Sequence, residues 1–252
     1  MKVVILCGGL GTRLAEETSV KPKPMINIGD KPILWHIMKS YEKYGFNDFI
    51  LALGYKGEYI KNFFINYHIK NSNITVNTSN GNISIYDKPK ENWNVSLINT
   101  GQDTLTGGRL LRLKNELTNT FMLTYGDGVS DINISKLLDF HKKNGKIATV
   151  TSVRPPARFG GMKIVDGVVK EFKEKPQIGE GSINGGFFVF EPEIFKYLED
   201  DNTILEKSPL ENLAINNQLT AFDHSGFWHC MDTIRDKESL NNLYENGFKP
   251  WL

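Results

Sequence analysis

The sequence predicts an α/β fold in which a mixed, mainly parallel sheet is covered by helices on both faces. Three observations lead to it: apolar strand-like runs alternate with helical segments, those runs are short and continuous, and a glycine-rich turn follows the first of them. Continuous apolar runs are typical of parallel strands that are buried on both faces. Strands that alternate with helices imply parallel connections. We expect one domain over residues 1–252, with no internal repeat.

Four apolar runs are the expected strands, and five segments are the expected helices, besides a helical signal in LLRLKNEL (110–117) that two glycines open. The strands are VVILC (3–7), FILAL (49–53), FMLTY (121–125) and IATVTSV (147–153). The helices are PILWHIMKSYEKYG (32–45), GEYIKNFFINY (57–67), ISKLLDFHKKNG (134–145), PLENLAINNQ (209–218) and TIRDKESLNNLYENG (233–247). The first helix begins with proline and ends with glycine, as helices often do. Its apolar stripe at helical spacing consists of Ile33, Ile37, Tyr41 and Tyr44.

Two segments interrupt the alternation. Residues 73–100 suggest short strands around an Asn-Gly turn, with little helix. Residues 160–191 suggest antiparallel strands joined by glycine-rich turns. We expect the first to be a small β-rich insert and the second to be a lid, both built on the parallel sheet.

Composition excludes several classes of protein. The chain has 252 residues and a formal net charge of +1, which argues against a general nucleic-acid binder. An anionic ligand must then be held by a few placed cations. Two cysteines, Cys7 and Cys230, without metal-ligand spacing favour a reducing, cytoplasmic setting. No apolar run approaches the roughly 20 residues of a membrane helix, and the N-terminal run is too short for a signal peptide.

The stretch LCGGLGTRL (6–14) places three glycines and Arg13 directly after the first strand. Ligands of open parallel sheets bind beyond the carboxyl ends of the strands. Glycine lets backbone N–H groups approach an anion, and arginine supplies a planar fork of donors. The stretch therefore suits a phosphate cradle, although a simple tight turn remains the alternative. The P-loop string is absent, and the dinucleotide fingerprint fails at Leu14.

A lysine–proline stretch, SVKPKPM (19–25), follows the cradle closely. Residues before proline prefer extended geometry, so we expect Lys21 and Lys23 to lie on a stiff extended arm and to point the same way. A solvated loop is the alternative. Two such lysines beside a glycine and arginine loop suit a triphosphate.

Together these stretches resemble the sugar-1-phosphate nucleotidyltransferase family over almost the whole chain. The matching motifs are GGLGTRL (8–14), KPKPM (21–25), YGDG (125–128), EKP (174–176), NGGFFVF (184–190) and GFWHCMDT (226–233). The combination of KPKPM, PILWHIM, TYGDGV, INGGFFV and DTIRDK is most similar to the members that join CTP and glucose 1-phosphate. The resemblance implies a Rossmann-like fold of the nucleotide-diphospho-sugar transferase type.

The reaction implied by the resemblance is Mg²⁺-dependent. An oxygen of glucose 1-phosphate attacks the α-phosphorus of CTP, pyrophosphate leaves, and CDP-glucose remains. Such a transfer needs alignment and charge neutralisation, and a phosphate nucleophile is already deprotonated. The absence of a catalytic histidine pair is therefore expected. His36 and His141, inside predicted helices, are expected to be structural.

The resemblance also implies roles for individual residues. Arg13 and Lys23 would be catalytic, and Asp127 and Asp232 would bind the metal. The nucleotide would contact Leu6, Cys7, Gly8, Gly9, Gly11, Thr12, Arg13, Lys23, Thr106, Gly107, Arg109 and Gly126. The sugar phosphate would contact Tyr125, Glu174, Lys175, Asn184, Gly185 and Trp228.

Several of these residues also have simpler interpretations. Asp127 also suits a turn and Asp232 a helix N-cap, although Thr233 can fill that position. Thr106 is a plausible N-cap for a helix that opens with two glycines, and Arg109 could equally be a surface charge. Phe227 and Trp228 could form a wall under the sugar or belong to the core.

Other functions remain open at this point. A related enzyme that uses UTP or dTTP would have the same chemistry, and a non-catalytic sensor would keep the pocket but lose a metal or phosphate residue. A homo-oligomer, by resemblance a hexamer, is expected, and the tail KPWL could pack on a neighbouring subunit. The resemblance further implies a role in dideoxysugar synthesis for surface polysaccharide (lipopolysaccharide O-antigen).

Overall fold

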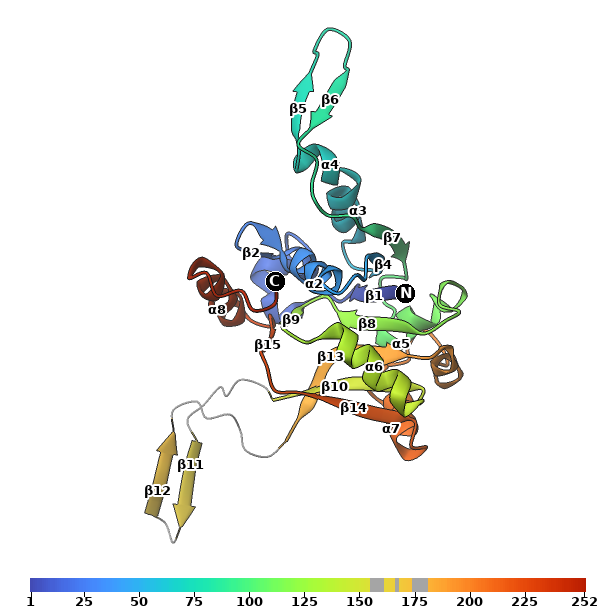
Figure 1. Cartoon of the computed structure of the whole chain (residues 1–252), viewed down its shortest axis with the longest axis vertical. Coiled ribbons are helices and arrows are strands. Elements are labelled where there is room, and N and C mark those ends of the chain that lie inside the picture. Colours follow the sequence, from blue (N-terminus) through green and yellow to red (C-terminus); the bar gives the residue numbers. More distant parts are fainter. Residues whose placement is uncertain (155–160, 166–167, 174–180) are drawn as a thin grey trace.

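A computed structural model describes the backbone of residues 1–154, 161–165, 168–173 and 181–252. A seven-stranded sheet with the order β14-β10-β13-β8-β1-β4-β7 forms its centre (Figure 1). The strands are β1 (Lys2–Cys7), β4 (Asp48–Leu53), β7 (Asn94–Asn99), β8 (Phe121–Tyr125), β10 (Ala148–Val153), β13 (Ile183–Phe190) and β14 (Leu219–His224). All pairings are parallel except those that β13 makes with β8 and β10. The predicted mixed, mainly parallel sheet is confirmed.

Both faces of the inner strands β1, β4 and β8 are buried, as their continuous apolar runs predict. Along β1, Val3 and Ile5 belong to one hydrophobic cluster and Val4 and Leu6 to another. Because successive strand residues point to opposite faces, each cluster is the core of one face. The first cluster contains side chains of α2 and α6, and the second contains side chains of α5 and α7.

The five predicted helices are present, with ends that differ by a few residues. The α-helices are α1 (Ala15–Thr18), α2 (Ile33–Glu42), α3 (Gly57–Ile65), α4 (Tyr67–Lys70), α5 (Thr106–Leu111), α6 (Ile134–Asn144), α7 (Ser208–Ile215) and α8 (Ile234–Glu245). Short 3-10 helices span Thr12–Leu14, Lys23–Met25, Lys114–Glu116 and Pro192–Tyr197. Gly145 ends α6 with a φ of 59°, a left-handed conformation that glycine adopts readily.

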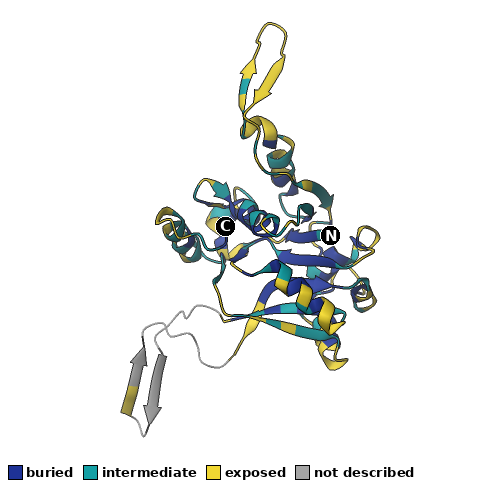
Figure 2. Ribbon diagram, in the orientation of Figure 1, coloured by how far each residue is buried: buried dark blue, intermediate teal, exposed yellow. Residues whose placement is uncertain are grey.

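The two segments that interrupt the alternation are smaller than predicted. Strands β5 (Asn73–Val76) and β6 (Ile83–Tyr86) form a hairpin that projects from the body, and its residues are largely exposed (Figure 2). Residues 94–99, grouped with this insert by the sequence, instead form β7 at the edge of the main sheet. Within the predicted lid, β11 (Gly161–Val165) pairs antiparallel with β12 (Val168–Lys173).

The end of the predicted lid belongs to the core. Residues 183–190 form β13, between β8 and β10 in the main sheet, and its last six residues are buried. Six consecutive buried residues need cover on both faces, which only the centre of a sheet supplies. The glycines at its start obscure this signal in the sequence.

The C-terminal tail packs on its own chain. Trp251 is only 1% exposed, and its Nε1 donates to His36 Nδ1 at 3.2 Å. The expectation that the aromatic tail packs on a neighbour is therefore wrong for this residue. Within the described residues, no helix has both the length and the apolar character needed to cross a bilayer.

Candidate active site

Four predicted site residues meet beyond the carboxyl ends of β1 and β8. Lys23 Nζ donates to Asp127 Oδ2 at 2.6 Å and to Asp232 Oδ1 at 2.5 Å. Arg13 Nη1 donates to Asp232 Oδ2 at 2.9 Å. These residues come from the first 25 positions, from the end of β8 and from the start of α8, so only the fold brings them together.

Two short strands set the distance between the aspartates. Strand β9 (Gly128–Ser130) pairs antiparallel with β15 (Trp228–Cys230), and Met231 N donates to Asp127 O at 2.8 Å. Asp232 follows directly. Thr233 then caps α8, and Asp236 closes a capping box, so the N-cap role considered for Asp232 belongs to its neighbour. The Asp232 carboxylate is thereby left for other partners.

The aspartate pair has the chemistry of a magnesium site. One oxygen of each carboxylate and the sulfur of Cys230 all lie within 4.8 Å of one another. Mg²⁺ takes hard oxygen ligands, often one or two carboxylates together with phosphates and water. Burial, followed by the charges of Asp127 and Asp232, raises the pKa of the Cys230 thiol, so this sulfur is a poor third ligand. The two carboxylates fit the ion.

The charges of the cluster are mutually stabilising. Burial alone would lower the pKa of Lys23, but the charge of Asp127 and the hydrogen bonds to both aspartates raise it. Burial would likewise raise the pKa of Asp232, but Lys23 and then Arg13 lower it. Lys23 therefore stays protonated and Asp232 ionised at neutral pH. The cluster therefore consists of two cations and two carboxylates that hold each other in their charged forms.

The turn that carries Lys23 differs from the prediction. Pro22 is extended, with a ψ of 149°, but Lys23–Met25 is a 3-10 turn closed by a bond from Met25 N to Pro22 O at 2.8 Å. A single extended arm through both lysines is therefore wrong. Pro24 and Met25 are buried in the core, and this packing overrides the extended preference of a residue before proline.

The glycine loop has a buried beginning and an exposed end. Leu6, Cys7 and Gly8 are buried, whereas Gly9, Thr12 and Arg13 are exposed. Gly11 has a φ of 65°, which an L side chain rarely adopts. A Cβ on Gly126 would lie 2.9 Å from Leu6 O, so that glycine allows β1 and the end of β8 to approach closely.

The N-terminus of α5 is packed against other protein segments and offers no free space for a ligand at its two glycines. Leu105, not Thr106, is the N-cap, and Thr106 Oγ1 instead donates to Glu206 Oε2 at 2.7 Å. A Cβ on Gly107 would lie 2.9 Å from Thr203 O, and Gly108 packs against the neighbouring backbone in the same way. These glycines therefore serve helix packing. Arg109 is 4% exposed, so it is not a surface charge.

The residues predicted to contact the sugar phosphate, where the structure describes them, are linked in pairs by hydrogen bonds. Asn184 Nδ2 donates to Tyr125 Oη at 3.4 Å, and Trp228 Nε1 donates to Gly185 O at 2.8 Å. Phe227 is half-buried and packs against Trp251 at the edge of the core, with ring centroids 5.4 Å apart. Glu174 and Lys175 lie outside the described residues.

Sequence reasoning missed Glu206. Its carboxylate accepts hydrogen bonds from Tyr125 Oη and Thr106 Oγ1, and so it links the predicted sugar and nucleotide sides. Nothing in its local sequence marks it, because these partners are 81 and 100 positions away.

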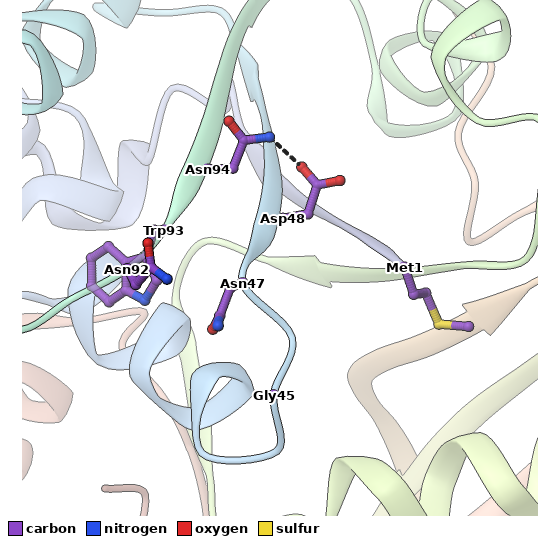
Figure 3. Close-up of a pocket in the computed structure, with 7 residues that line it drawn as sticks. All are labelled: Met1, Gly45, Asn47, Asp48, Asn92, Trp93 and Asn94. Carbon is purple, nitrogen blue, oxygen red and sulfur yellow. Dashed lines mark hydrogen bonds between the residues drawn. The ribbon is translucent and has the colours of Figure 1, made fainter.

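The histidines behave as predicted for structural residues. His36 Nε2 lies 2.9 Å from Ile28 O, and His141 lies between Thr149 and Glu191. A separate groove lies at the opposite end of the strands, lined by Met1, Gly45, Asn47, Asp48, Asn92, Trp93 and Asn94 (Figure 3). Because it adjoins the starts of β1, β4 and β7, this groove is distinct from the aspartate cluster.

The chain is similar to known proteins in both sequence and fold. The family model described as "Nucleotidyl transferase" matches residues 2–232. A glucose-1-phosphate cytidylyltransferase of Salmonella typhi is 50% identical, with 100% of this chain and 98% of the relative covered. A "Probable glucose-1-phosphate cytidylyltransferase" of Bacillus subtilis is 46% identical, with 100% and 99% covered. The crystal structure of HddC from Yersinia pseudotuberculosis has a similar fold, with a TM-score of 0.70, 24% identity and coverage of 96% and 99%.

Proposed function

The chain belongs to the nucleotidyl transferase family, and from this premise we propose that it transfers a cytidylyl group from CTP to α-D-glucose 1-phosphate, giving CDP-glucose and pyrophosphate. The observation that carries the proposal is the 50% sequence identity, over the full chain, to a relative named for this activity. The ion-pair cluster of Arg13, Lys23, Asp127 and Asp232 supports it.

The reaction is a displacement at phosphorus. An oxygen of the sugar phosphate forms a bond to the α-phosphorus, and the bond from that phosphorus to the bridging oxygen of pyrophosphate breaks. The leaving pyrophosphate takes the electron pair. The nucleophile carries no proton at neutral pH, so no side chain has to remove one.

The cations of the cluster have the electrostatic role. Two anionic reactants repel each other, and charge grows on the departing pyrophosphate. Arg13, which is largely exposed, and Lys23, which is fixed between two carboxylates, would offset both effects. Asp127 and Asp232 would hold Mg²⁺, which supplies further positive charge to the phosphates when bound.

The substrates would lie on either side of this cluster. The nucleotide would follow the loop from Leu6 to Arg13 and the backbone at Gly126. The glucose phosphate would contact Tyr125, Asn184, Gly185 and Trp228, together with Glu174 and Lys175. The bonds from Asn184 to Tyr125 and from Trp228 to Gly185 support a common sugar subsite.

The proposal extends to setting and assembly. Both cysteines are free thiols, which is consistent with a cytoplasmic enzyme. We propose a homo-oligomer, a hexamer by resemblance to the family. Apolar side chains exposed on the β5–β6 hairpin, such as Val76 and Ile83, support a contact between copies. CDP-glucose would serve dideoxysugar synthesis for surface polysaccharide.

Pyrophosphate release tests the proposal directly. The purified protein is mixed with Mg²⁺ and glucose 1-phosphate, and each nucleoside triphosphate is supplied separately. We expect the largest kcat/KM with CTP and no release without the sugar phosphate. A larger value with UTP or dTTP would overturn the base assignment and leave the chemistry in place. Nucleotide binding without any release would indicate a non-catalytic sensor.

A further inference from the structure

Arg109 is a buried cation whose partners are almost all backbone carbonyls. Its Nη1 donates to Gly101 O at 2.5 Å, to Thr100 Oγ1 at 3.0 Å and to Leu53 O at 3.2 Å. Its Nη2 donates to Gly8 O at 3.0 Å and to Gln102 O at 3.1 Å. None of these hydrogen bonds goes to a carboxylate.

The acceptors come from three neighbouring strands. Gly8 follows β1, Leu53 ends β4, and residues 100–102 follow β7. The guanidinium therefore joins the carboxyl ends of β1, β4 and β7, which are adjacent in the sheet. The predicted nucleotide loop begins at the first of these ends. Two backbone bonds reinforce the junction: Tyr55 N donates to Gly8 O at 3.2 Å, and Thr100 N donates to Leu53 O at 2.9 Å.

Two glycines leave room for this side chain. A Cβ on Gly8 would lie 2.2 Å from Arg109 Cζ, and a Cβ on Gly54 would lie 2.4 Å from Arg109 Nη1. Neither distance is tolerable, so a side chain at either position would displace the guanidinium. Gly8 is thus required by a neighbouring side chain of the same protein.

The four Nη donors of Arg109 are already used. Arginine has five N–H donors, four of which are on its two Nη atoms. Three acceptors surround Nη1 and two surround Nη2. A ligand that took a hydrogen bond from either Nη would have to compete with these acceptors, four of which are backbone carbonyls, and a buried carbonyl without a donor is costly.

We infer that Arg109 is a positioning residue, which holds the start of the glycine loop in its nucleotide-binding geometry through Gly8 and the ends of β4 and β7. It acts in place of the direct nucleotide contact that the family resemblance suggests. This inference rests on the proposed function only in naming the nucleotide as CTP.

Hydrogen exchange of the nucleotide-free protein separates the two roles. Arg109→Lys keeps the charge but loses the fork that spans three strands. We expect faster amide exchange in the peptides that contain Tyr55 and Thr100, and unchanged exchange in α6. Isothermal titration should show CTP binding that is weaker by roughly tenfold, the size of one or two lost hydrogen bonds. The KM for glucose 1-phosphate should stay within about twofold of the wild-type value.

Two further variants complete the test. Gly54→Ala displaces the guanidinium without removing it and should reproduce both effects, which keeps the inference testable if Arg109→Lys does not fold. Arg112→Lys is the matched control, because Arg112 lies one helical turn away and pairs with Asp201 at the surface. It should leave exchange and CTP binding unchanged.

The outcomes are distinct. If Arg109→Lys weakens CTP binding while exchange in the free protein is unchanged, Arg109 contacts the nucleotide directly and the inference is overturned. Unchanged CTP binding together with faster exchange would make the residue merely structural, which also overturns it. Failure of the wild type to release pyrophosphate would contradict the proposed function but would leave the exchange result intact.

Discussion

The ammonium group of Lys23 lies 2.6 Å from the carboxylate of Asp127, although the two residues are 104 positions apart in the chain. The side chain of Lys23 is 12% exposed. Its ammonium group donates a second hydrogen bond to the carboxylate of Asp232. One cation therefore bridges the two proposed metal ligands, and Arg13 supplies the second positive charge. Substrate and metal would enter a site whose charges are already fixed in place, which is the arrangement expected of electrostatic catalysis.

The two proposed catalytic cations differ in burial, and this difference gives the first prediction. Loss of either preorganised charge should lower kcat by about 10²-fold or more. Arg13 is 75% exposed, so Arg13→Ala should change the free energy of unfolding by only about 0–1 kcal/mol. Lys23→Ala leaves the half-buried carboxylate of Asp127 without its cation, while Asp232 keeps only Arg13, and should cost about 2 kcal/mol. Urea unfolding and steady-state rates measure both effects. Near-normal kcat in either variant would remove that residue from the mechanism.

The second prediction concerns the metal ligands. Asp127→Asn and Asp232→Asn each replace a charged oxygen ligand by a neutral one, so Mg²⁺-dependent pyrophosphate release should be lost. Binding of Mn²⁺ with CTP, followed by electron paramagnetic resonance, should weaken in parallel. Asp201→Asn is the control, because Asp201 pairs with Arg112 at the surface. Activity of either site variant at ordinary Mg²⁺ levels would contradict the assignment.

The third prediction is a pH dependence of stability. Lys23 and Arg13 lower the pKa of Asp232 against the effect of burial. A carboxyl whose pKa is lower in the folded state contributes stability above its unfolded pKa of about 3.9 and loses it as the pH falls through the folded value. The stability difference between the wild type and Asp232→Asn should therefore shrink from about pH 5 downward. Lys23, with a raised pKa, has the opposite dependence and loses its contribution only above about pH 10.4.

Urea titrations of both proteins at several pH values measure this difference. Subtracting the stability of the variant cancels the contributions of other carboxyls with a lowered pKa, which among the described residues are Glu17, Asp30 and Asp201. A difference that stays constant between about pH 5 and pH 3 would mean that the Asp232 ion pairs contribute no stability.

The fourth prediction concerns the tail. Trp251 is buried against His36 and Phe227, so Trp251→Ala should cost about 3–5 kcal/mol of unfolding free energy. Leu252→Ala should cost much less, because the Leu252 side chain is exposed. Denaturant unfolding measures both costs, and size-exclusion chromatography should show the same assembly for the Leu252 variant. Equal costs in the two variants would contradict the buried position of Trp251.

Much of the fold follows from local pattern. VVILC and FILAL are strands because continuous β-branched and apolar runs need cover on both faces, and ISKLLDFHKKNG is a helix with a glycine at its end. The segments that the sequence placed wrongly also have a physical explanation. Residues 94–99 and 183–190 are polar or glycine-rich at their starts, and their place in the sheet depends on partners far away in the chain.

The candidate site divides in the same way. The motifs around Arg13, Lys23, Asp127 and Asp232 point to its members through their resemblance to the family, and the residue types are compatible with phosphate or Mg²⁺. The environments of Arg109 and Glu206 are not visible in the motifs. Arg109 is surrounded by carbonyls of three strands, and Glu206 accepts from two distant hydroxyls.

The amino-acid sequence by itself determined the layered α/β class and the residues that carry charge at the carboxyl ends of the strands, because hydrophobic period and turn chemistry are local properties. Only the tertiary structure decided that Lys23 lies between two aspartates and that Arg109 is engaged by backbone. Both depend on burial and on hydrogen bonds between segments that are far apart in the chain. Such hydrogen bonds form only when the sheet has brought these segments together.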